Sequence, residues 1–389
     1  MAEAKVTYLI GAGASANALP VVNGMNERME IFVDFLKKSC DILKLNEDPQ
    51  YRISNSSFSK IDNLLLEIKS QYTIDTYAKK LFLLEDYDTL EYLKRFLTAY
   101  LIFEQISFNT SLCDKIVSSI VEDYNKSSDT LKIEIIEKIK SRVDYRYDSI
   151  FANLLLFSTK KIDSKINFIS WNYDNQFEIS YQNYRKERYS LDEIQDELQI
   201  IPSLKNCNHN KEFSGILKLN GTAGFFDANM SYGKLFDFSK HIMDTDTIKL
   251  FIVSVLSGRS QFDNSIKFAW ENDVQVTKAR EYAKEIIGNS DIVVIIGYSF
   301  PTFNRIVDRE IFKIFNEVCI TRFDRGGVTF RPFGLPKDVK QMINKKIYIQ
   351  DTPQNAPKIK ERLKAIGNNL FDVTVIYDDV DQFLIPYEL

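Results

Sequence analysis

Residues 166–174 read INFISWNYD, an apolar run followed by alternating polar side chains. Residues 166–169 predict a buried strand that leads directly to Asn172 and Asp174. In an open α/β sheet, ligands bind beyond the carboxyl ends of the strands. A carboxamide and a carboxylate two residues apart at such an end can hold a sugar or a water. Asp174 could also simply cap the helix expected next, but that role would leave Asn172 unexplained.

Three further candidate strands end in the same way. Residues 6–10 lead into Gly11-Ala12-Gly13-Ala14-Ser15, residues 216–219 into Asn220-Gly221-Thr222, and residues 292–296 into Gly297-Tyr298-Ser299. The carboxyl ends of parallel strands lie at one edge of a sheet. Four strands that end in Gly, Ser, Asn or Asp therefore predict one shared nucleotide site.

Strands and helices alternate from residue 166 onward. Further strands are expected at 347–349 and 373–376, helices at 175–188, 277–287 (closed by Gly288) and 304–316, and loops at 202–214 and 225–246. This alternation predicts a doubly wound, mostly parallel, Rossmann-like α/β sheet. Residues 26–165 have helical apolar spacing instead. We expect one domain, residues 1–389, in which residues 26–165 form a large helical insert after the first strand.

Composition indicates a soluble globular protein, with 44% apolar and 27% charged residues among 389. The formal net charge of −4 and the lack of long basic runs give no evidence of a nucleic-acid site or of binding to an anionic membrane. No run reaches the length of a membrane span, and the N-terminus lacks the features of a signal peptide, so we expect a cytoplasmic protein.

The four cysteines are scattered and form no Cys-x-x-Cys pair, which excludes a zinc ribbon built from thiolates. Cys207 and His209 are close in sequence, but two further metal ligands are missing. We therefore expect no metal. The histidines, His209 and His241, both fall in predicted loops, where a surface role is expected.

The residues Gly11-Ala12-Gly13-Ala14-Ser15-Ala16 fit a loose dinucleotide-binding pattern if Ala16 replaces the third glycine. Small residues let the backbone approach a pyrophosphate. A tight turn without a ligand would need the same residues. A Rossmann oxidoreductase should have an acidic residue at the end of a second strand about 20 residues on. Here Glu30 and Asp34 lie in a helical stretch, which disfavours hydride transfer.

Together these motifs resemble the sirtuin-like NAD-binding fold. The chain is most similar to bacterial sirtuin-like proteins of antiphage defence, which hydrolyse NAD, and the stretch from Lys267 through Arg305 is particularly similar to that branch. The resemblance covers residues 7–20 and most of 166–352. Protein-deacylating sirtuins carry a four-cysteine zinc module that this sequence lacks, which favours NAD hydrolysis over lysine deacylation. The resemblance also implies a homo-oligomer and a possible HerA-like ATPase partner.

The resemblance implies roles for individual residues. The nucleotide would be lined by Gly11, Ala12, Gly13, Ser15 and Gly297. Asn172 would hold the nicotinamide ribose or the attacking water, and Asp174 would order that pocket. The adenosine side would be bound by Ser299 and Asn304, and the adenine ribose by Asp351. Cleavage of the nicotinamide–ribose bond passes through an oxocarbenium-like state. The protein must therefore position water and stabilise positive charge on the sugar.

Asn220 departs from the family pattern, which has a histidine taken as the general base at this position. An asparagine side chain cannot accept a proton at neutral pH, and general-base catalysis typically contributes about 10²–10⁴-fold. Three explanations stay open: an engineered substitution, a natural variant with weak or altered activity, or a protein that only binds nucleotide. Asn172 and Asn220 are the expected catalytic pair.

Overall fold

The computed structural model describes residues 4–20, 24–49, 51, 53–105, 111–138, 143–187, 189–203, 214–227, 245–256, 262–325, 345–367 and 374–389. Cys207, His209, His241 and the predicted loop residues 204–213 and 228–244 lie outside these ranges. Within them, no helix is long and apolar enough to cross a membrane.

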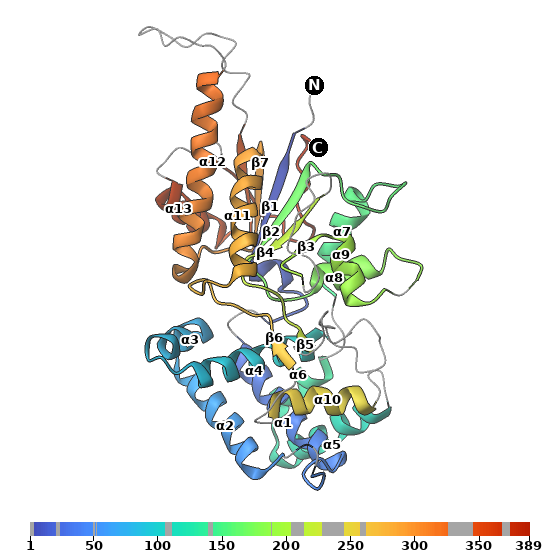
Figure 1. The fold of residues 1–389 in the computed structure, drawn as a ribbon. Coiled ribbons are helices and arrows are strands. Elements are labelled where there is room, and N and C mark those ends of the chain that lie inside the picture. The colour runs from blue at the N-terminus through green and yellow to red at the C-terminus, as the bar shows by residue number, and fades with distance from the viewer. Residues whose placement is uncertain are drawn as a thin grey trace.

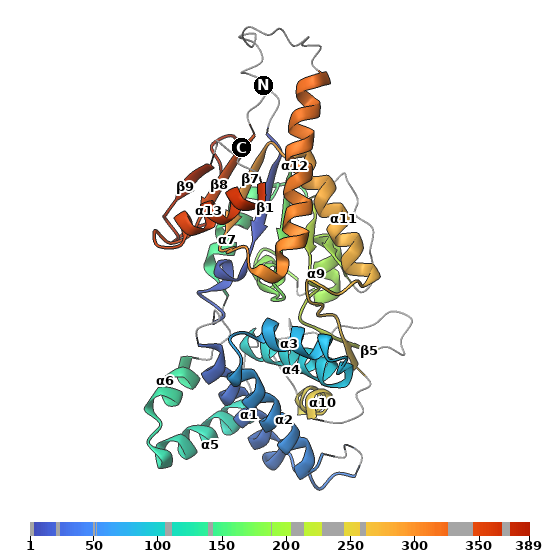
Figure 2. The same ribbon diagram turned by 90° about the vertical axis from the view of Figure 1, so that its left-hand side faces the viewer.

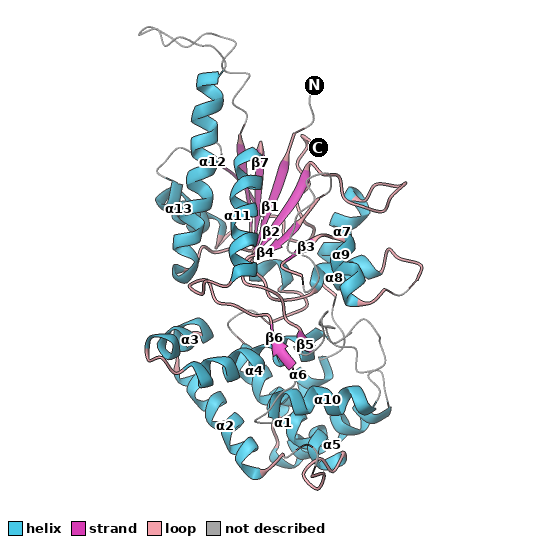
Figure 3. Ribbon diagram, viewed as in Figure 1, coloured by secondary structure: helices cyan, strands magenta, loops and turns pink. Residues whose placement is uncertain are grey.

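A seven-stranded parallel sheet forms the centre of the α/β layer (Figure 3). Its strand order is β3-β4-β2-β1-β7-β8-β9. The strands are β1 (Val6–Ile10), β2 (Ile166–Ser170), β3 (Ile200–Ile201), β4 (Ile216–Lys218), β7 (Ile292–Ile296), β8 (Lys346–Gln350) and β9 (Thr374–Tyr377). The predicted α/β class is confirmed, although the two-residue strand β3 was not expected. β1 pairs with β2 on one side and with β7 on the other. The strands that follow β2 extend the sheet on one side of β1, and those that follow β7 extend it on the other side. Ligands of open α/β sheets bind at such a switch point.

Helices cover both faces of this sheet (Figure 1). One face packs against α7 (Tyr145–Leu154), α8 (Gln176–Gln182) and α9 (Leu191–Glu197), and the other against α11 (Val274–Asn289), α12 (Arg305–Arg325) and α13 (Ala356–Gly367). β1 and β7 are buried along their whole length, and β2 is buried everywhere except at Asn167, so helices cover both faces of these central strands.

Helix boundaries differ from the sequence prediction at several places. The helix expected over 304–316 continues to Arg325, and the helix expected from 277 begins at Val274. The helix expected over 175–188 ends at Gln182, and a second helix begins at Leu191. Ser190 caps this second helix, because its side chain accepts from the Glu193 amide while the Glu193 carboxylate accepts from the Ser190 amide. Gly288 lies inside α11 and does not close it.

A second layer, mostly helical, lies beyond the carboxyl ends of the strands (Figure 2). It contains α1 (Met25–Ile42), α2 (Asn55–Ser70), α3 (Ile74–Leu83), α4 (Tyr87–Gln105), α5 (Ser111–Ser127), α6 (Thr130–Lys138) and α10 (Thr245–Leu256), with the antiparallel pair β5 (Phe225–Asp227) and β6 (Phe262–Asn264). Buried aromatic rings, including Phe32, Phe96 and Phe103, fill its core. The expectation of a loop over 225–246 is thus wrong at both ends, where β5 and the start of α10 lie. α7, although within 26–165, packs on the sheet.

Candidate functional site

The loops that follow β1 and β7 are packed directly against each other. Gly297 has a φ of +58°, and a Cβ atom there would lie 2.3 Å from the Ala14 nitrogen. The Gly13 amide donates to the Gly297 carbonyl at 3.0 Å, and the Gly11 amide donates to the Ile296 carbonyl at 3.0 Å. The small residues therefore allow two backbone segments to meet at the switch point of the sheet. Their predicted phosphate-binding role stays a prediction, and the Gly11 and Gly13 amides already have protein acceptors.

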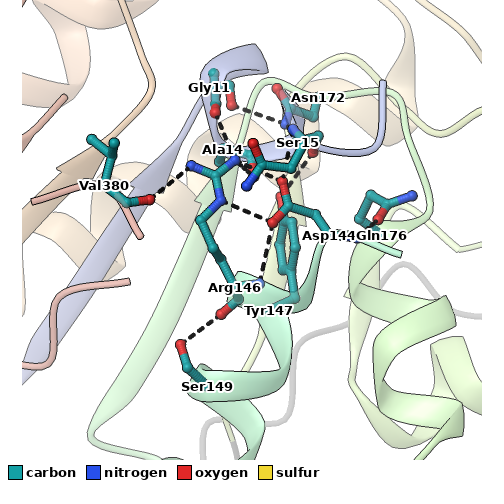
Figure 4. A network of polar contacts seen from close by, with 12 residues as sticks. Gly11, Ala14, Ser15, Asp144, Arg146, Tyr147, Ser149, Asn172, Gln176 and Val380 are labelled. Atoms are coloured by element: carbon teal, nitrogen blue, oxygen red, sulfur yellow. Dashed lines mark hydrogen bonds and ion pairs between the residues drawn. The ribbon is translucent and has the colours of Figure 1, made fainter. Parts of the chain in front are cut away.

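Asn172 joins the end of β2 to the loop after β1 (Figure 4). Its side-chain Nδ2 donates to the Gly11 carbonyl at 3.0 Å and to Ser15 Oγ at 3.3 Å. Ser15 Oγ lies 3.0 Å from the Tyr147 hydroxyl. Asn172 thus lies within hydrogen-bonding distance of both Gly11 and Ser15. The sequence predicted all three residues for one site, although they follow two different strands.

Arg146 supports the same loop from α7, and sequence reasoning missed it. Its guanidinium donates to the carbonyls of Gly13 and Ala14 at 3.2 and 3.0 Å (Figure 4). Asp144 pairs with Arg146 at 2.6 Å and caps α7 by accepting from the Arg146 amide. A sequence signal existed: Asp144 directly precedes a helical apolar pattern, the usual position of an N-cap.

Asp174 is buried at the start of α8. Its Oδ1 accepts from the Gln176 amide at 3.1 Å, so it stabilises the start of this helix, as the simpler sequence interpretation allowed. Burial raises the pKa of the Asp174 carboxyl, and the nearby Lys218 ammonium opposes that rise. The two roles considered for Asp174 are compatible, and its role towards a ligand stays a prediction.

Asn220 follows β4 in a turn that Gly221 makes possible. Gly221 has a φ of +78°, and a Cβ there would lie 2.0 Å from the Ser265 carbonyl oxygen. Asn220 is only 6% exposed, and its Nδ2 donates weakly to the Tyr173 hydroxyl at 3.4 Å. Its Oδ1 is buried without a hydrogen-bond partner among the residues that the structure describes. A buried acceptor without a donor is costly, and such groups often mark functional positions.

Tyr173, in the loop after β2, links Asn220 to the helical layer. Tyr173, the hydrogen-bond partner of Asn220, packs against the core of that layer. Burial raises the pKa of the Tyr173 phenol well above its ordinary value, and Asp75 in the first turn of α3 raises it further. Burial also raises the pKa of Asp75 to about 6. Four residues later on α3, Lys79 Nζ lies 4.9 Å from the centre of the Trp270 ring.

The last residue of α4 reaches the loop after β2. Gln105 Oε1 accepts from the Asn175 amide at 2.8 Å and from Gln176 Nε2 at 3.3 Å. Earlier on α4, Lys94 pairs with Glu271 at 2.5 Å. Four residues before Glu271, the Lys267 amide donates to the Asn220 carbonyl at 2.9 Å. The helical layer is thus bonded to the loops at the strand ends.

The residues predicted for the adenosine side follow β7 and β8, and each of them bonds to different partners. Asn304 Nδ2 donates to the Tyr298 hydroxyl at 3.1 Å, and Tyr298 donates to both oxygens of Asp308 at 2.7 and 3.0 Å. Ser299 is exposed, and its carbonyl accepts from Arg362. Asp351 Oδ1 accepts from the Thr352 amide at 2.7 Å just before α13. Their roles in binding adenosine stay predictions.

Among the described residues, no group of three or more His, Cys, Asp and Glu side chains could hold a metal ion. Cys40 and Cys113 are both buried.

No protein-family model matches this chain, and no curated protein matches it. A solved structure described as "Structural Basis for the Mechanism and Regulation of Sir2 Enzymes" is similar to it at 12% sequence identity. The alignment covers 96% of this chain and 87% of that chain, with a TM-score of 0.37. A likeness this distant carries no argument about chemistry, so the functional argument depends on the residues themselves.

Proposed function

We propose that this protein binds NAD at the carboxyl edge of the sheet and hydrolyses it to ADP-ribose and nicotinamide. The observation that supports this most is the buried Oδ1 of Asn220, which has no partner among the described residues. It lies at the same edge as Asn172, and a ribose hydroxyl or a water would supply the missing donor. The glycine contacts between the β1 and β7 loops place a tight backbone turn at the switch point of the same sheet.

The proposed reaction requires the protein to do little covalent chemistry itself. Nicotinamide leaves as a neutral group, and the sugar passes through an oxocarbenium-like state. Asn172 would hold the ribose or the attacking water, since its amide is fixed by Gly11 and Ser15. Asn220 would accept a hydrogen bond but could not take a proton. We therefore expect slow turnover from this chain.

Its biological role is also part of the proposal. By its sequence resemblance, the chain would act in the cytoplasm as an antiphage effector that depletes NAD. It would work as a homo-oligomer, with a HerA-like ATPase as a possible partner. An effector of this kind needs an inactive state, and the bonds between α4 and the strand-end loops offer a route by which assembly could act on the site.

A second candidate function is a catalytically silent nucleotide-binding subunit. Asn220 supports it, because an amide in the place of the expected base preserves binding but loses proton transfer.

Titration calorimetry with NAD and chromatography of the products would test both candidates. Binding followed by ADP-ribose and nicotinamide would support the hydrolase. Binding without products would support the silent subunit, and the absence of binding would overturn both. An Asn289→Ala variant is a suitable control, because Asn289 is exposed at the end of α11 and only bonds to the Glu285 carbonyl.

A further inference from the structure

Lys218 is a fully buried lysine at the carboxyl end of β4, two residues before Asn220. It shares the face of Ile216, which packs with α8 and α9. Lysine is almost never fully buried unless its charge is paired, because removing an ammonium group from water is costly. Its position therefore calls for a specific explanation.

The Lys218 ammonium is surrounded by four oxygen atoms from three segments. They are the Asp174 carbonyl at 2.7 Å, Glu178 Oε1 at 2.7 Å, Thr222 Oγ1 at 3.0 Å and Asn175 Oδ1 at 3.4 Å. An ammonium has three donor hydrogens, so these acceptors use its whole capacity. Asp174 and Asn175 belong to the loop after β2, Glu178 to α8, and Thr222 to the turn after β4.

The two loops also bond directly to each other around this ammonium. Thr222 Oγ1 donates to Asn175 Oδ1 at 2.7 Å, and Asn175 Nδ2 donates to the Ala223 carbonyl at 2.9 Å. The Ala223 amide donates to the Tyr173 carbonyl at 2.6 Å. Lys218 thus lies at the centre of the connection between the loop that carries Asn172 and the turn that carries Asn220.

Charge pairing alone does not account for this arrangement. The fully buried Glu178 carboxylate already balances the lysine charge, and Gln195 Nε2 donates to it at 3.1 Å. The contacts with Asp174 and Thr222 add neutral acceptors, one from each loop. The two donor hydrogens that Glu178 does not occupy need acceptors in any buried site, and here one acceptor comes from each of the two loops.

We propose that Lys218 is a positioning residue that fixes the separation between Asn172 and Asn220, and so is required for turnover more than for nucleotide binding. This inference rests on the proposed NAD hydrolysis. Misplacement of reacting groups by about 1 Å can cost about a hundredfold in rate. Lys218 itself touches neither of the two asparagines.

The test replaces both buried charges by Lys218→Met with Glu178→Leu. Apolar replacement of a buried ion pair is often tolerated, whereas removing one partner leaves an uncompensated charge. The matched control is Lys346→Met with Glu388→Leu, a lysine–glutamate pair at the amino end of β8 on the same sheet. Readouts are the melting temperature, hydrogen exchange of the Ala223 amide, the Kd for NAD, and kcat and KM for nicotinamide release.

We expect the Lys218–Glu178 double variant to fold, to exchange the Ala223 amide faster, and to bind NAD within about threefold of the parent. Its kcat should fall about a hundredfold, while the control double variant keeps the parent values. A folded variant with unchanged kcat would overturn the proposal. Should the parent chain release no nicotinamide, the proposed function fails, and the Ala223 exchange rate alone decides: faster exchange supports the loop-joining role, and unchanged exchange refutes it.

Thr222→Val keeps the inference testable if the double variant does not fold. This substitution preserves the side-chain shape and the ion pair but removes one acceptor of Lys218. Faster exchange of the Ala223 amide and a kcat lowered by about tenfold would support the proposal. Parent values for both would overturn it.

Discussion

The side-chain nitrogen of Asn172 lies 3.0 Å from the carbonyl oxygen of Gly11. Ile10 and Ser170 are paired in the parallel register of β1 and β2, so Gly11 and Asn172 lie just past the last rung of the same ladder. The Asn172 side chain thus adds a hydrogen bond between the segments that follow β1 and β2, beyond the last backbone pair of the two strands. Asn172 therefore has a structural role in addition to the one proposed for it in binding ribose or water.

Asn172→Ala should abolish NAD cleavage and also lower the free energy of unfolding by about 1–2 kcal/mol, since the substitution removes hydrogen bonds to Gly11 and Ser15. The measurements are nicotinamide release and denaturant unfolding. Asn153→Ala is a matched control, because Asn153 is exposed on α7 and bonds only to the Ser149 carbonyl. Full activity of the folded Asn172→Ala protein would contradict its role in the chemistry.

Gly297→Ala should destabilise the protein strongly. A Cβ there would approach the Ala14 nitrogen to 2.3 Å and the Gly13 carbonyl carbon to 2.4 Å, in addition to the strain of a positive φ. Gly24 also has a positive φ, but nothing lies within 4 Å of its added Cβ. Gly24→Ala should therefore lower the free energy of unfolding by about 1–3 kcal/mol, from backbone strain alone. Gly297→Ala should lower it by at least ~2 kcal/mol more. Equal unfolding midpoints for the Gly24→Ala and Gly297→Ala proteins would show that the loops after β1 and β7 move apart at little cost in stability.

The central strands could be predicted from the sequence because buried strands consist mainly of apolar residues. β1, β2 and β7 are apolar runs that end abruptly in Gly, Ser or Asn, a pattern that a helix would not keep. β3 was missed because two residues, Ile200 and Ile201, carry no periodicity. The helical break between Gln182 and Leu191 was missed because the polar residues there also suit an exposed helical face.

The strand-end residues were predictable, whereas their supports were not. Lys218, Arg146 and Gln105 each act through partners that are distant in sequence or that belong to backbone carbonyls. A lysine at the end of a strand normally points to solvent, and only the tertiary arrangement shows that Lys218 is buried. Local patterns predict where a site lies but not which buried charges hold it in place.

Asp308→Asn should make stability less dependent on pH. Burial raises the pKa of Asp308 from 3.8 to about 8, against the opposing effect of the hydrogen bond from Tyr298. Between those two values the folded chain keeps a proton that the unfolded chain releases. The free energy of unfolding therefore falls as pH rises, by up to ~1.4 kcal/mol per pH unit, until the folded pKa is passed.

The asparagine variant removes this titration but keeps an acceptor for Tyr298. Its melting temperature should exceed that of the parent at pH 8, and the difference should shrink towards pH 5. Asp246→Asn, at an exposed aspartate in the first turn of α10, is the control and should show no such trend. A constant difference between parent and Asp308→Asn across this range would mean that Asp308 is ionised in the folded protein.

Asn220→His should raise NAD hydrolysis by at least about tenfold, a modest part of the usual general-base effect. The position is favourable because Asn220 is only 6% exposed, and its Oδ1 lacks a partner in the described part of the chain. An imidazole has an ordinary pKa near neutrality and can take the proton that an amide cannot. The Tyr173 hydroxyl, now 3.4 Å from Asn220 Nδ2, would be available to orient the ring.

Nicotinamide release should be measured for both forms, with the candidate partner present so that an inactive assembly does not hide the gain. Asn220→Gln is the matched control: it alters the side-chain length but supplies no base, so it should give no increase. A faster histidine form would also have a rate that rises with pH through the imidazole pKa, because only the neutral ring accepts a proton. Equal rates in protein shown to bind NAD would mean that residue 220 is not the position of the base.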